Sequence, residues 1–166
     1  MKKTILIYYS FSNGNTERVA NYIASRAEID VFKVETVKEY GEDVNDVGAA
    51  EVKAKFEPEL KEIPDLSEYE VVIIGTPTWW YSISPAIRSL LSKVDLTGKT
   101  VVPFTTNGGW PGQAMRTLRK LCAKAKEIVE PKAVRFDSSG GAVMKTPPIE
   151  VVNWAKRVVK NVINPS

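Results

Sequence analysis

Short apolar segments alternate with amphipathic segments along this chain of 166 residues. The spacing of the apolar residues predicts strands at about 4–9, 30–36, 69–75, 99–105 and 128–136. It predicts helices at about 15–27, 84–93, 111–126 and 147–163, with one more near 46–56 inside the long segment 37–67. Strands that alternate with helices form parallel sheets through right-handed crossovers. We therefore expect an α/β fold: a doubly wound, five-stranded parallel sheet in the order 2-1-3-4-5, with helices on both faces.

The loop after the third predicted strand is rich in aromatic residues. Residues 75–81 read Gly-Thr-Pro-Thr-Trp-Trp-Tyr and follow the apolar run 71–74. An open α/β sheet binds its ligands at the carboxyl ends of its strands, so these rings favour a flat aromatic ligand. Aromatic residues in such a loop also form hydrophobic plugs beneath it, and the loop alone is compatible with both interpretations.

The loop after the first predicted strand is rich in small polar residues. Residues 10–16 read Ser-Phe-Ser-Asn-Gly-Asn-Thr, and the helical pattern that follows places Val19, Ala20 and Ile23 on one face. Unpaired N–H groups and the positive end of the helix dipole favour an anion at such a helix start. An ordinary N-cap needs only one of these polar residues, so their number favours a phosphate site. The loop holds no Lys or Arg, and Arg18 is the nearest cation.

Three motifs, which together span most of the chain, resemble the flavodoxin family. Residues 12–16 resemble the flavodoxin phosphate loop, a run of Ser and Thr that closes on Gly-Asn-Thr, and residues 77–81 are similar to its aromatic flavin loop. Residues 101–109, Val-Val-Pro-Phe-Thr-Thr-Asn-Gly-Gly, are similar to the later strand and Gly-rich loop on the other side of the flavin. The resemblance is closest to a short branch of the family with Trp-Trp in the aromatic loop and Leu-x-Gly-Lys-x-Val-Val-Pro-Phe before the Gly-rich loop, as at 96–104.

The phosphate loop departs from the family pattern at two positions. Asn13 stands where a Thr usually precedes Gly-Asn-Thr, and Phe11 stands where a further hydroxyl is expected. Ser10 and Ser12 lie on either side of Phe11, and either could supply that hydroxyl. The sequence therefore leaves open which hydroxyl contacts a phosphate.

The resemblance implies a flavodoxin-like fold and flavin mononucleotide (FMN) as the cofactor. The residues that would hold its phosphate are Ser10, Ser12, Asn13, Gly14, Asn15 and Thr16. Those that would flank its ring are Pro77, Thr78, Trp79, Trp80 and Tyr81. Backbone N–H groups would meet its pyrimidine edge, with glycine permitting close approach, at Thr106, Asn107, Gly108 and Gly109. The two glycines are equally compatible with a plain turn, and Trp110 either shields the ring or is a surface aromatic.

Two functions are compatible with this resemblance. The first is an electron carrier that shuttles electrons between a reductase and an acceptor, as flavodoxins do. The alternative is an NAD(P)H-dependent FMN reductase that reduces a quinone or a flavin and needs room for nicotinamide above the ring. A binding module that has lost its flavin is a third reading, and the intact Gly14-Asn15-Thr16 speaks against it. No residue is assigned a catalytic role, and no metal ligand is expected.

The residues that this sequence lacks exclude several classes of enzyme. It contains no histidine, which rules out a Ser-His-Asp hydrolase, a His-ligated zinc site and a histidine general base. It also lacks Gly-x-x-x-x-Gly-Lys-Ser/Thr, and no Gly-x-Gly-x-x-Gly follows its first strand. Nucleotide hydrolysis and dinucleotide binding of the usual kinds are therefore not expected.

The length and composition favour one domain. A chain of this length with 43% hydrophobic residues can bury a core but is short for two domains, so we expect residues 1–166 to form a single domain. The single cysteine, Cys122, cannot form an internal disulfide, and its apolar neighbours indicate a packing role in a reducing compartment. No apolar run approaches the ~18 residues that span a bilayer, and no cleavage site follows Met1-Lys2-Lys3. We expect a cytoplasmic protein without a membrane partner.

The formal net charge is +3, and the basic residues are interspersed with acidic ones. This small excess does not favour nucleic acid as a partner. Flavodoxins as a group are acidic and dock on basic redox partners, and this chain does not share that property. The resemblance therefore implies redox partner proteins, or NAD(P)H and a quinone, without identifying them. It also leaves a monomer and a homodimer open.

Overall fold

The computed structural model describes residues 1–11, 13–138 and 141–166. Its centre is a parallel sheet with the strand order β2-β1-β3-β5-β6. The parallel strands are β1 (Thr4–Tyr8), β2 (Asp30–Lys33), β3 (Val71–Trp79), β5 (Thr100–Asn107), β6 (Glu127–Ile128) and β7 (Lys132–Arg135). A short β4 (Ser82–Ile83) runs antiparallel to β3. Because β6 and β7 both pair with β5 and share the fifth position, the predicted order 2-1-3-4-5 is confirmed.

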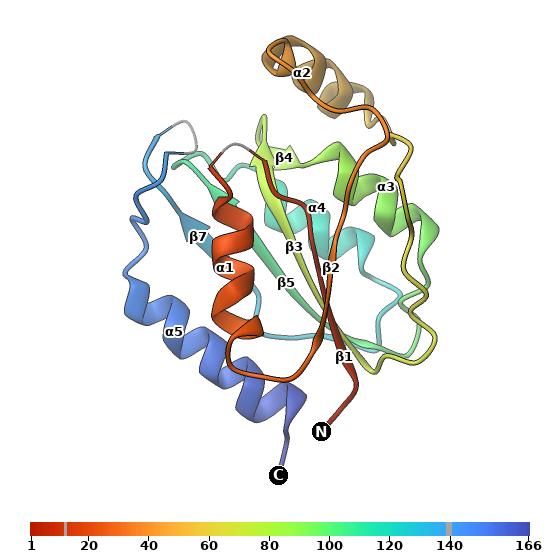
Figure 1. Cartoon of the computed structure of the whole chain (residues 1–166), viewed down its shortest axis with the longest axis vertical. Helices are drawn as coiled ribbons and strands as arrows, with labels where there is room; N and C mark the ends of the chain where they lie inside the picture. The colour runs from red at the N-terminus through yellow and green to blue at the C-terminus, as the bar shows by residue number, and fades with distance from the viewer. Residues whose placement is uncertain (12, 139–140) are drawn as a thin grey trace.

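Helices cover both faces of the sheet, as predicted (Figure 1). The helices are α1 (Asn15–Ala24), α2 (Val44–Ala54), α3 (Pro85–Lys93), α4 (Ala114–Leu121) and α5 (Pro148–Arg157), which continues into the π-helical η2 (Val158–Ile163). α1 and α5 pack on one face and α3 and α4 on the other, whereas α2 lies beyond the carboxyl end of the sheet. No helix in the described ranges combines the length and the apolar character that crossing a membrane requires.

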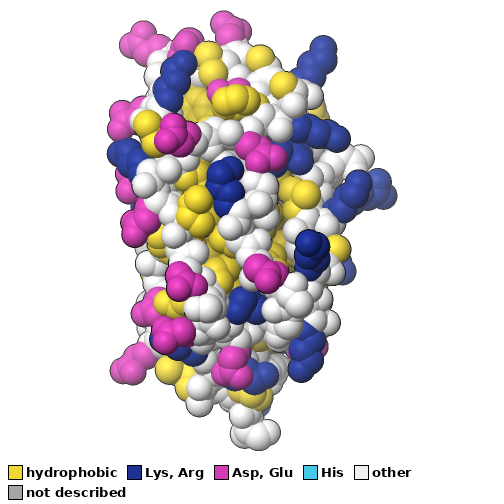
Figure 2. All heavy atoms as spheres, turned by 90° about the vertical axis from the view of Figure 1, so that its right-hand side faces the viewer, with side chains coloured by type: hydrophobic (Ala, Val, Ile, Leu, Met, Phe, Trp, Pro, Cys, Tyr) yellow, Lys and Arg dark blue, Asp and Glu magenta, His cyan; other side chains and the backbone are white. Residues whose placement is uncertain are grey.

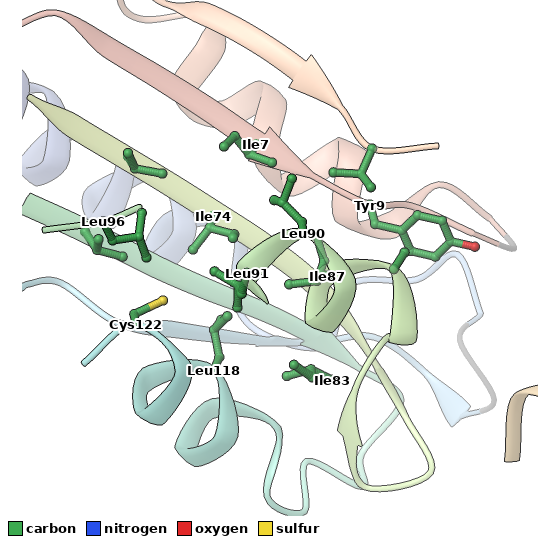
Figure 3. Close-up of a cluster of buried hydrophobic side chains, with 14 of the residues drawn as sticks. Ile7, Tyr9, Ile74, Ile83, Ile87, Leu90, Leu91, Leu96, Leu118 and Cys122 are labelled. Carbon is green, nitrogen blue, oxygen red and sulfur yellow. The ribbon is translucent and has the colours of Figure 1, made fainter. Parts of the chain in front are cut away.

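The sheet separates two clusters of buried apolar side chains. Val72 and Ile74 of β3 point toward α3 and α4, whereas Val71 and Ile73 point toward α1 and α5, because successive residues of a strand face opposite sides. Both faces are covered, so the strands read as continuous apolar runs. Figure 3 shows the cluster under α3 and α4, with Ile7, Tyr9, Ile74, Ile83, Ile87, Leu90, Leu91, Leu96, Leu118 and Cys122 labelled. The full burial of Cys122 in this cluster confirms its packing role.

β3 is longer than predicted. The sequence places its end near residue 75, but pairing with β5 continues through Thr76 and Pro77. Trp79 then pairs with Ser82 of β4 in a hairpin. The prediction of a loop from residue 76 onward was wrong, because partners on β5 and β4 override the loop character of a segment that contains proline.

Other predicted elements differ at their ends. The predicted strand 128–136 is divided into β6 and β7, because Glu130 has a positive φ of 50° and Pro131 has no N–H to continue the ladder. The predicted helix 111–126 shortens to α4, which starts after the left-handed Gly112 at φ 49°. The predicted strand 30–36 shortens to the four residues of β2.

Candidate functional site

A cavity of about 390 Å³ lies where the segment after β1 and the carboxyl ends of β3 and β5 meet the start of α1. This volume falls within the range of about 300–1,000 Å³ that is typical of small-molecule sites. Ten of the fifteen sequence-predicted site residues line it: Asn15, Thr16, Pro77, Thr78, Trp79, Trp80, Tyr81, Thr106, Asn107 and Gly108. The three motifs, which are far apart in the sequence, therefore meet at one place.

Some lining residues were not predicted, and some predicted residues lie elsewhere. The lining also contains Phe11, Val44 and Asn45, of which Val44 and Asn45 belong to the start of α2, and Trp110, for which the sequence left a ring-shielding role and a surface position open. The segment 37–67 is longer than a simple crossover needs, and this extra length was the one sequence feature that indicated an additional wall of the cavity. Four predicted residues are outside the lining: Ser10, Asn13, Gly14 and Gly109. Ser12 is outside the described residues.

Gly14 determines how α1 begins. Its φ of 71° lies in the left-handed region, which glycine adopts without steric cost. As the N-cap residue it has no side chain, so it offers no side-chain oxygen to the first-turn N–H groups of α1. The Ser10 hydroxyl accepts a long hydrogen bond of 3.4 Å from the Glu17 N–H at this turn. An anion at this helix start would meet backbone N–H groups and the positive end of the helix dipole.

Two buried hydroxyls join the start of α1 to the end of β5. Thr16 Oγ1 and Thr106 Oγ1 are 2.8 Å apart and share a hydrogen bond. Such a bond uses the proton of only one hydroxyl, so the other hydroxyl can still donate. Both threonines line the cavity, and a ligand there could accept that second proton.

The segment after β7 contacts the first residues of α1. Asn15 Nδ2 donates a 2.8 Å hydrogen bond to the Gly141 carbonyl. Arg18 Nη1 donates to the Ala142 carbonyl at 2.5 Å, and the Arg18 guanidinium lies 5.2 Å from the centre of the Phe136 ring. Arg18, the nearest cation in the sequence, therefore binds this segment and is not among the residues that line the cavity.

A two-residue turn at Trp80 and Tyr81 joins β3 to β4. Their φ angles are 44° and 65°, and positive φ at both central residues is the requirement of a type I′ hairpin turn. Asn, Asp and Gly usually occupy these positions, and a positive φ costs a bulky residue on the order of 1–3 kcal/mol. Backbone strain of this kind concentrates at functional sites.

Contacts on two sides hold this turn in place. On one side, the Gln113 N–H donates a 2.7 Å hydrogen bond to the Tyr81 carbonyl, and a Cβ added at Gly112 would overlap Tyr81. On the other side, the Trp80 ring lies against α2, where a Cβ added at Gly48 would be 2.7 Å from Trp80 Cζ3. The strained turn is thus fixed by the loop before α4 and by α2.

The aromatic side chains of the site differ in exposure. Trp79 is only 8% exposed and packs edge-on, with ring centroids 5.0 to 6.0 Å away, against Tyr9, Phe11, Tyr40 and Trp80. The exposed fractions of the other rings at the cavity are 40% for Trp80, 58% for Tyr81 and 67% for Trp110. Trp79 therefore supports the wall from inside, whereas the other three rings offer faces to a ligand.

The family model for flavodoxin matches residues 3–138. The chain belongs to the flavodoxin family. A flavodoxin from Nostoc sp. strain PCC 7120 is 34% identical over 113 residues, which are 64% of this chain and 52% of that protein. An NAD(P)H dehydrogenase (quinone) from Chromohalobacter salexigens is 27% identical over 137 residues, which are 73% of this chain and 65% of that protein. The chain thus spans between about half and two thirds of the length of these relatives.

Solved structures share the fold of this flavodoxin-family chain at low sequence identity. A Bacteroides uniformis ATCC 8492 protein that has been proposed to be a flavoprotein has a TM-score of 0.75 and 24% identity, covering 93% of this chain and 98% of that one. A flavoprotein from Lactobacillus acidophilus NCFM, solved in complex with FMN, has a TM-score of 0.68 and 20% identity, covering 80% and 93%. At these identities the likeness establishes the shared fold.

The cavity of this flavodoxin-family chain provides hydrogen-bonding groups and aromatic rings, but its described lining residues provide no acid or base that acts at neutral pH. Burial raises the pKa of Tyr9 and of Tyr40 well above the usual value, and the Glu51 carboxylate raises both further. The Tyr40 hydroxyl also donates a 2.5 Å hydrogen bond to Glu51 Oε1. Both phenols therefore stay protonated near neutral pH. Among the described residues that line the cavity, none has a side chain that titrates near pH 7.

Two polar groups complete the wall of the cavity. The Thr78 hydroxyl is buried and has no hydrogen-bond partner among the described residues, an arrangement that costs about 1–3 kcal/mol. Asn107 Oδ1 accepts a 2.8 Å hydrogen bond from the Gly109 N–H. The Gly109 N–H, one of several backbone N–H groups of this loop that were expected to face a ligand, is therefore used inside the loop, whereas Thr78 retains a free hydrogen-bonding capacity.

Proposed function

We propose that this chain binds FMN in the cavity and carries electrons between a reductase and an acceptor protein. The observation that carries the proposal is the meeting, in one cavity, of the helix start at Asn15 and Thr16 with the turn at Trp80 and Tyr81. A ligand with a phosphate at one end and a flat ring at the other needs both features. Membership of the flavodoxin family and the FMN complex of the Lactobacillus acidophilus relative support this choice of ligand.

The phosphate end is assigned to the start of α1. Backbone N–H groups there and the hydroxyl pair of Thr16 and Thr106 supply hydrogen-bond donors, and the helix dipole favours the negative charge. The lining contains no Lys or Arg among the described residues, so neutral donors would carry the interaction with the phosphate. Ser10 and Ser12 remain candidates for a further hydroxyl, as the family pattern implies.

The ring end is assigned to the aromatic turn. Trp80, Tyr81 and Trp110 present exposed faces, and a stacked pair of rings contributes about 0.5–1.5 kcal/mol beyond the area it buries. Thr78 would gain a partner for its buried hydroxyl at the ring edge, which fits a ligand with polar atoms in its plane. The residues present therefore fit both ends of FMN.

FMN, when bound, supplies one-electron and two-electron redox chemistry. The chain would hold the ring near the surface, because Tyr81 and Trp110 are both exposed at the cavity. Trp79 would keep water from the buried side of the wall. Electron transfer requires no protonating side chain, which agrees with the absence of a group titrating near neutral pH among the described residues of the lining.

The alternative is an NAD(P)H-dependent reductase of quinones or flavins. The exposure of Trp80, Tyr81 and Trp110 favours it, since exposed rings leave an approach by which a second flat molecule could reach a bound flavin. The similarity to the Chromohalobacter salexigens NAD(P)H dehydrogenase (quinone) supports it as well. This function requires a binding site for nicotinamide in addition to the one for FMN.

Anaerobic addition of NADPH or NADH to the FMN-loaded protein separates the two functions. For the electron carrier, we expect a bound flavin that dithionite reduces and that nicotinamide leaves oxidised. Rapid loss of the flavin absorbance on adding NADPH or NADH would favour the reductase. A protein that binds no FMN would contradict both.

A further inference from the structure

Acidic and basic residues occupy different parts of this chain. The segment 35–70 contains twelve Asp and Glu and only four Lys and Arg. The segment 96–126 contains six Lys and Arg and no Asp or Glu. Figure 2 shows the resulting division on one side of the molecule, with acidic side chains mainly on the left and Lys and Arg mainly on the right. The net charge of +3 therefore conceals two surfaces of opposite sign.

The basic surface is formed by α4 and the turn after it. Its exposed cations are Arg116, Arg119, Lys120 and Lys124. Within the described part of the chain, no carboxylate lies within ion-pair distance of any of these four, and Arg116 bonds only to Gln113 Oε1 at 3.2 Å. Lys124 acts only weakly on Asp95: hydrogen bonds from Thr97 and, to a lesser extent, the charge of Lys124 hold the pKa of Asp95 below the usual value. The positive charge of α4 is thus largely uncompensated.

This basic surface begins at the mouth of the cavity. Gln113, the N-cap of α4, is bonded to Tyr81, which lines the cavity, and Trp110 lies three residues earlier in the same loop. With a rise of 1.5 Å per residue, Arg119 and Lys120 follow about 10 Å further along the helix axis. A protein that covers the cavity mouth would therefore also reach these cations.

The opposite rim of the mouth is acidic. Val44 and Asn45 line the cavity at the start of α2, and the exposed acids Glu42, Asp43 and Asp46 surround them. Exposed aromatic rings lie between this acidic rim and the basic surface: Trp80, Tyr81 and Trp110. An apolar centre with a charged rim is the usual anatomy of a protein–protein interface.

We propose that the basic surface of α4 docks an acidic surface of a redox partner protein over the cavity mouth. The inference rests on the proposed electron-carrier function and specifies its partner. In each encounter one electron would pass between the partner's redox centre and the flavin, so one is oxidised as the other is reduced. Attraction to the cations of α4 would speed association, and repulsion by the acids at the start of α2 would orient the partner's acidic patch toward α4.

A matched pair of charge reversals tests this proposal. R119E/K120E changes the α4 surface, and K156E/K160E changes two exposed lysines on α5 and η2 that form no ion pair among the described residues. Each double variant takes the formal net charge from +3 to −1. The probe is an acidic [2Fe–2S] ferredoxin. Its affinity is measured by calorimetry at low salt with or without bound flavin, and its electron transfer to the FMN-loaded protein is measured by stopped flow.

We expect R119E/K120E to weaken ferredoxin binding and to slow electron transfer ~10-fold or more at low salt. K156E/K160E should change both quantities little. At high salt the difference between the two variants should disappear. Equal effects of the two variants, or no effect of R119E/K120E, would overturn the proposal. A homodimer that R119E/K120E dissociates, without a change in ferredoxin affinity, would also overturn it by making a second copy the occupant.

Two further readouts keep the interpretation clear. Reduction of basic cytochrome c by the reduced protein should be as fast or faster in R119E/K120E, because the variant removes repulsion; a slower reaction would count against charge as the cause. The FMN affinity of each variant is measured separately. A protein that binds ferredoxin through α4 but binds no FMN would contradict the proposed cofactor and support the docking surface.

Discussion

The backbone N–H of Gln113 donates a 2.7 Å hydrogen bond to the carbonyl of Tyr81. This bond joins the loop before α4 to the turn in which Trp80 and Tyr81 both have positive φ. Gly112, next to Gln113, fits against Tyr81 only because it has no side chain. One wall of the cavity therefore depends on a loop that follows a different strand of the sheet.

Replacing Gly112 with alanine should disturb this wall. Both its φ of 49° and its contact with Tyr81 disfavour a Cβ at this position. We expect Gly112→Ala to lower the free energy of unfolding by about 1–3 kcal/mol and to weaken FMN binding. Urea unfolding and titration with FMN measure the two effects.

Gly98→Ala is the matched control for this variant. Gly98 also has a positive φ, 79°, but a Cβ added there would meet nothing within 4 Å. Gly98→Ala should therefore lower the free energy of unfolding only through its strained backbone, and it should leave the FMN affinity unchanged. If Gly112→Ala and Gly98→Ala bound FMN equally well, the contact between Gly112 and Tyr81 would have no role in shaping the site.

Thr16→Val tests the phosphate end of the site. It leaves the buried Thr106 hydroxyl without its partner, which should cost about 1–3 kcal/mol of unfolding free energy; Thr106→Val should cost a similar amount. Because Thr16 belongs to the helix start, Thr16→Val should weaken FMN binding more than Thr106→Val does. Riboflavin has no phosphate, so its affinity should not change. An equal loss of affinity for both ligands would refute the phosphate assignment.

Thr78→Val should affect the free and the FMN-bound protein in opposite directions. The buried Thr78 hydroxyl has no partner among the described residues, so its removal should leave the free energy of unfolding of the flavin-free protein unchanged or raise it. If the hydroxyl bonds to the flavin, the same change should weaken FMN binding by about 0.5–1.5 kcal/mol. Thermal unfolding with and without FMN reveals both effects. A variant that binds FMN as tightly as the original protein would remove Thr78 from the site.

The buried Cys122 should make stability fall at alkaline pH. Burial raises its pKa in the folded protein to about 12, from an ordinary value of 9.0. The folded chain keeps a proton that the unfolded chain loses between these values, so the free energy of unfolding is unaffected below pH 9 and declines above it. Cys122→Ala should make the decline less steep in urea unfolding between about pH 7 and 10.5. If the free energy of unfolding declined equally with pH in the original protein and in Cys122→Ala, the decline would be assigned to the tyrosines alone.

The strand order and the three loops of the site could be predicted from the sequence because they depend on local patterns. Apolar runs, helical spacing and polar or aromatic residues at strand ends are readable one segment at a time. Thr16 and Trp80 were placed in the site in this way and Thr106 by the resemblance to flavodoxins, and all three line the cavity.

The remaining features depend on which segments pack together. Val44 and Asn45 reach the cavity because α2 lies against Trp80, and nothing in their own sequence indicates this contact. Two adjacent tryptophans look equivalent in the sequence, yet Trp79 is buried and Trp80 is exposed, because Trp79 is the last residue of β3 and Trp80 is the first residue of the turn that follows it. The separation of charge was visible along the chain but was concealed by the net value of +3.

The central claim is that the cavity binds FMN through both its phosphate and its ring. The most direct test is a fluorescence titration of the flavin-free protein with FMN and, separately, with riboflavin. We expect saturable binding of FMN with quenched fluorescence, and an affinity at least ~10-fold higher than that for riboflavin because the phosphate adds hydrogen bonds to a charged group. Equal affinity for the two flavins would contradict the phosphate site, and failure to bind either would contradict the proposed function.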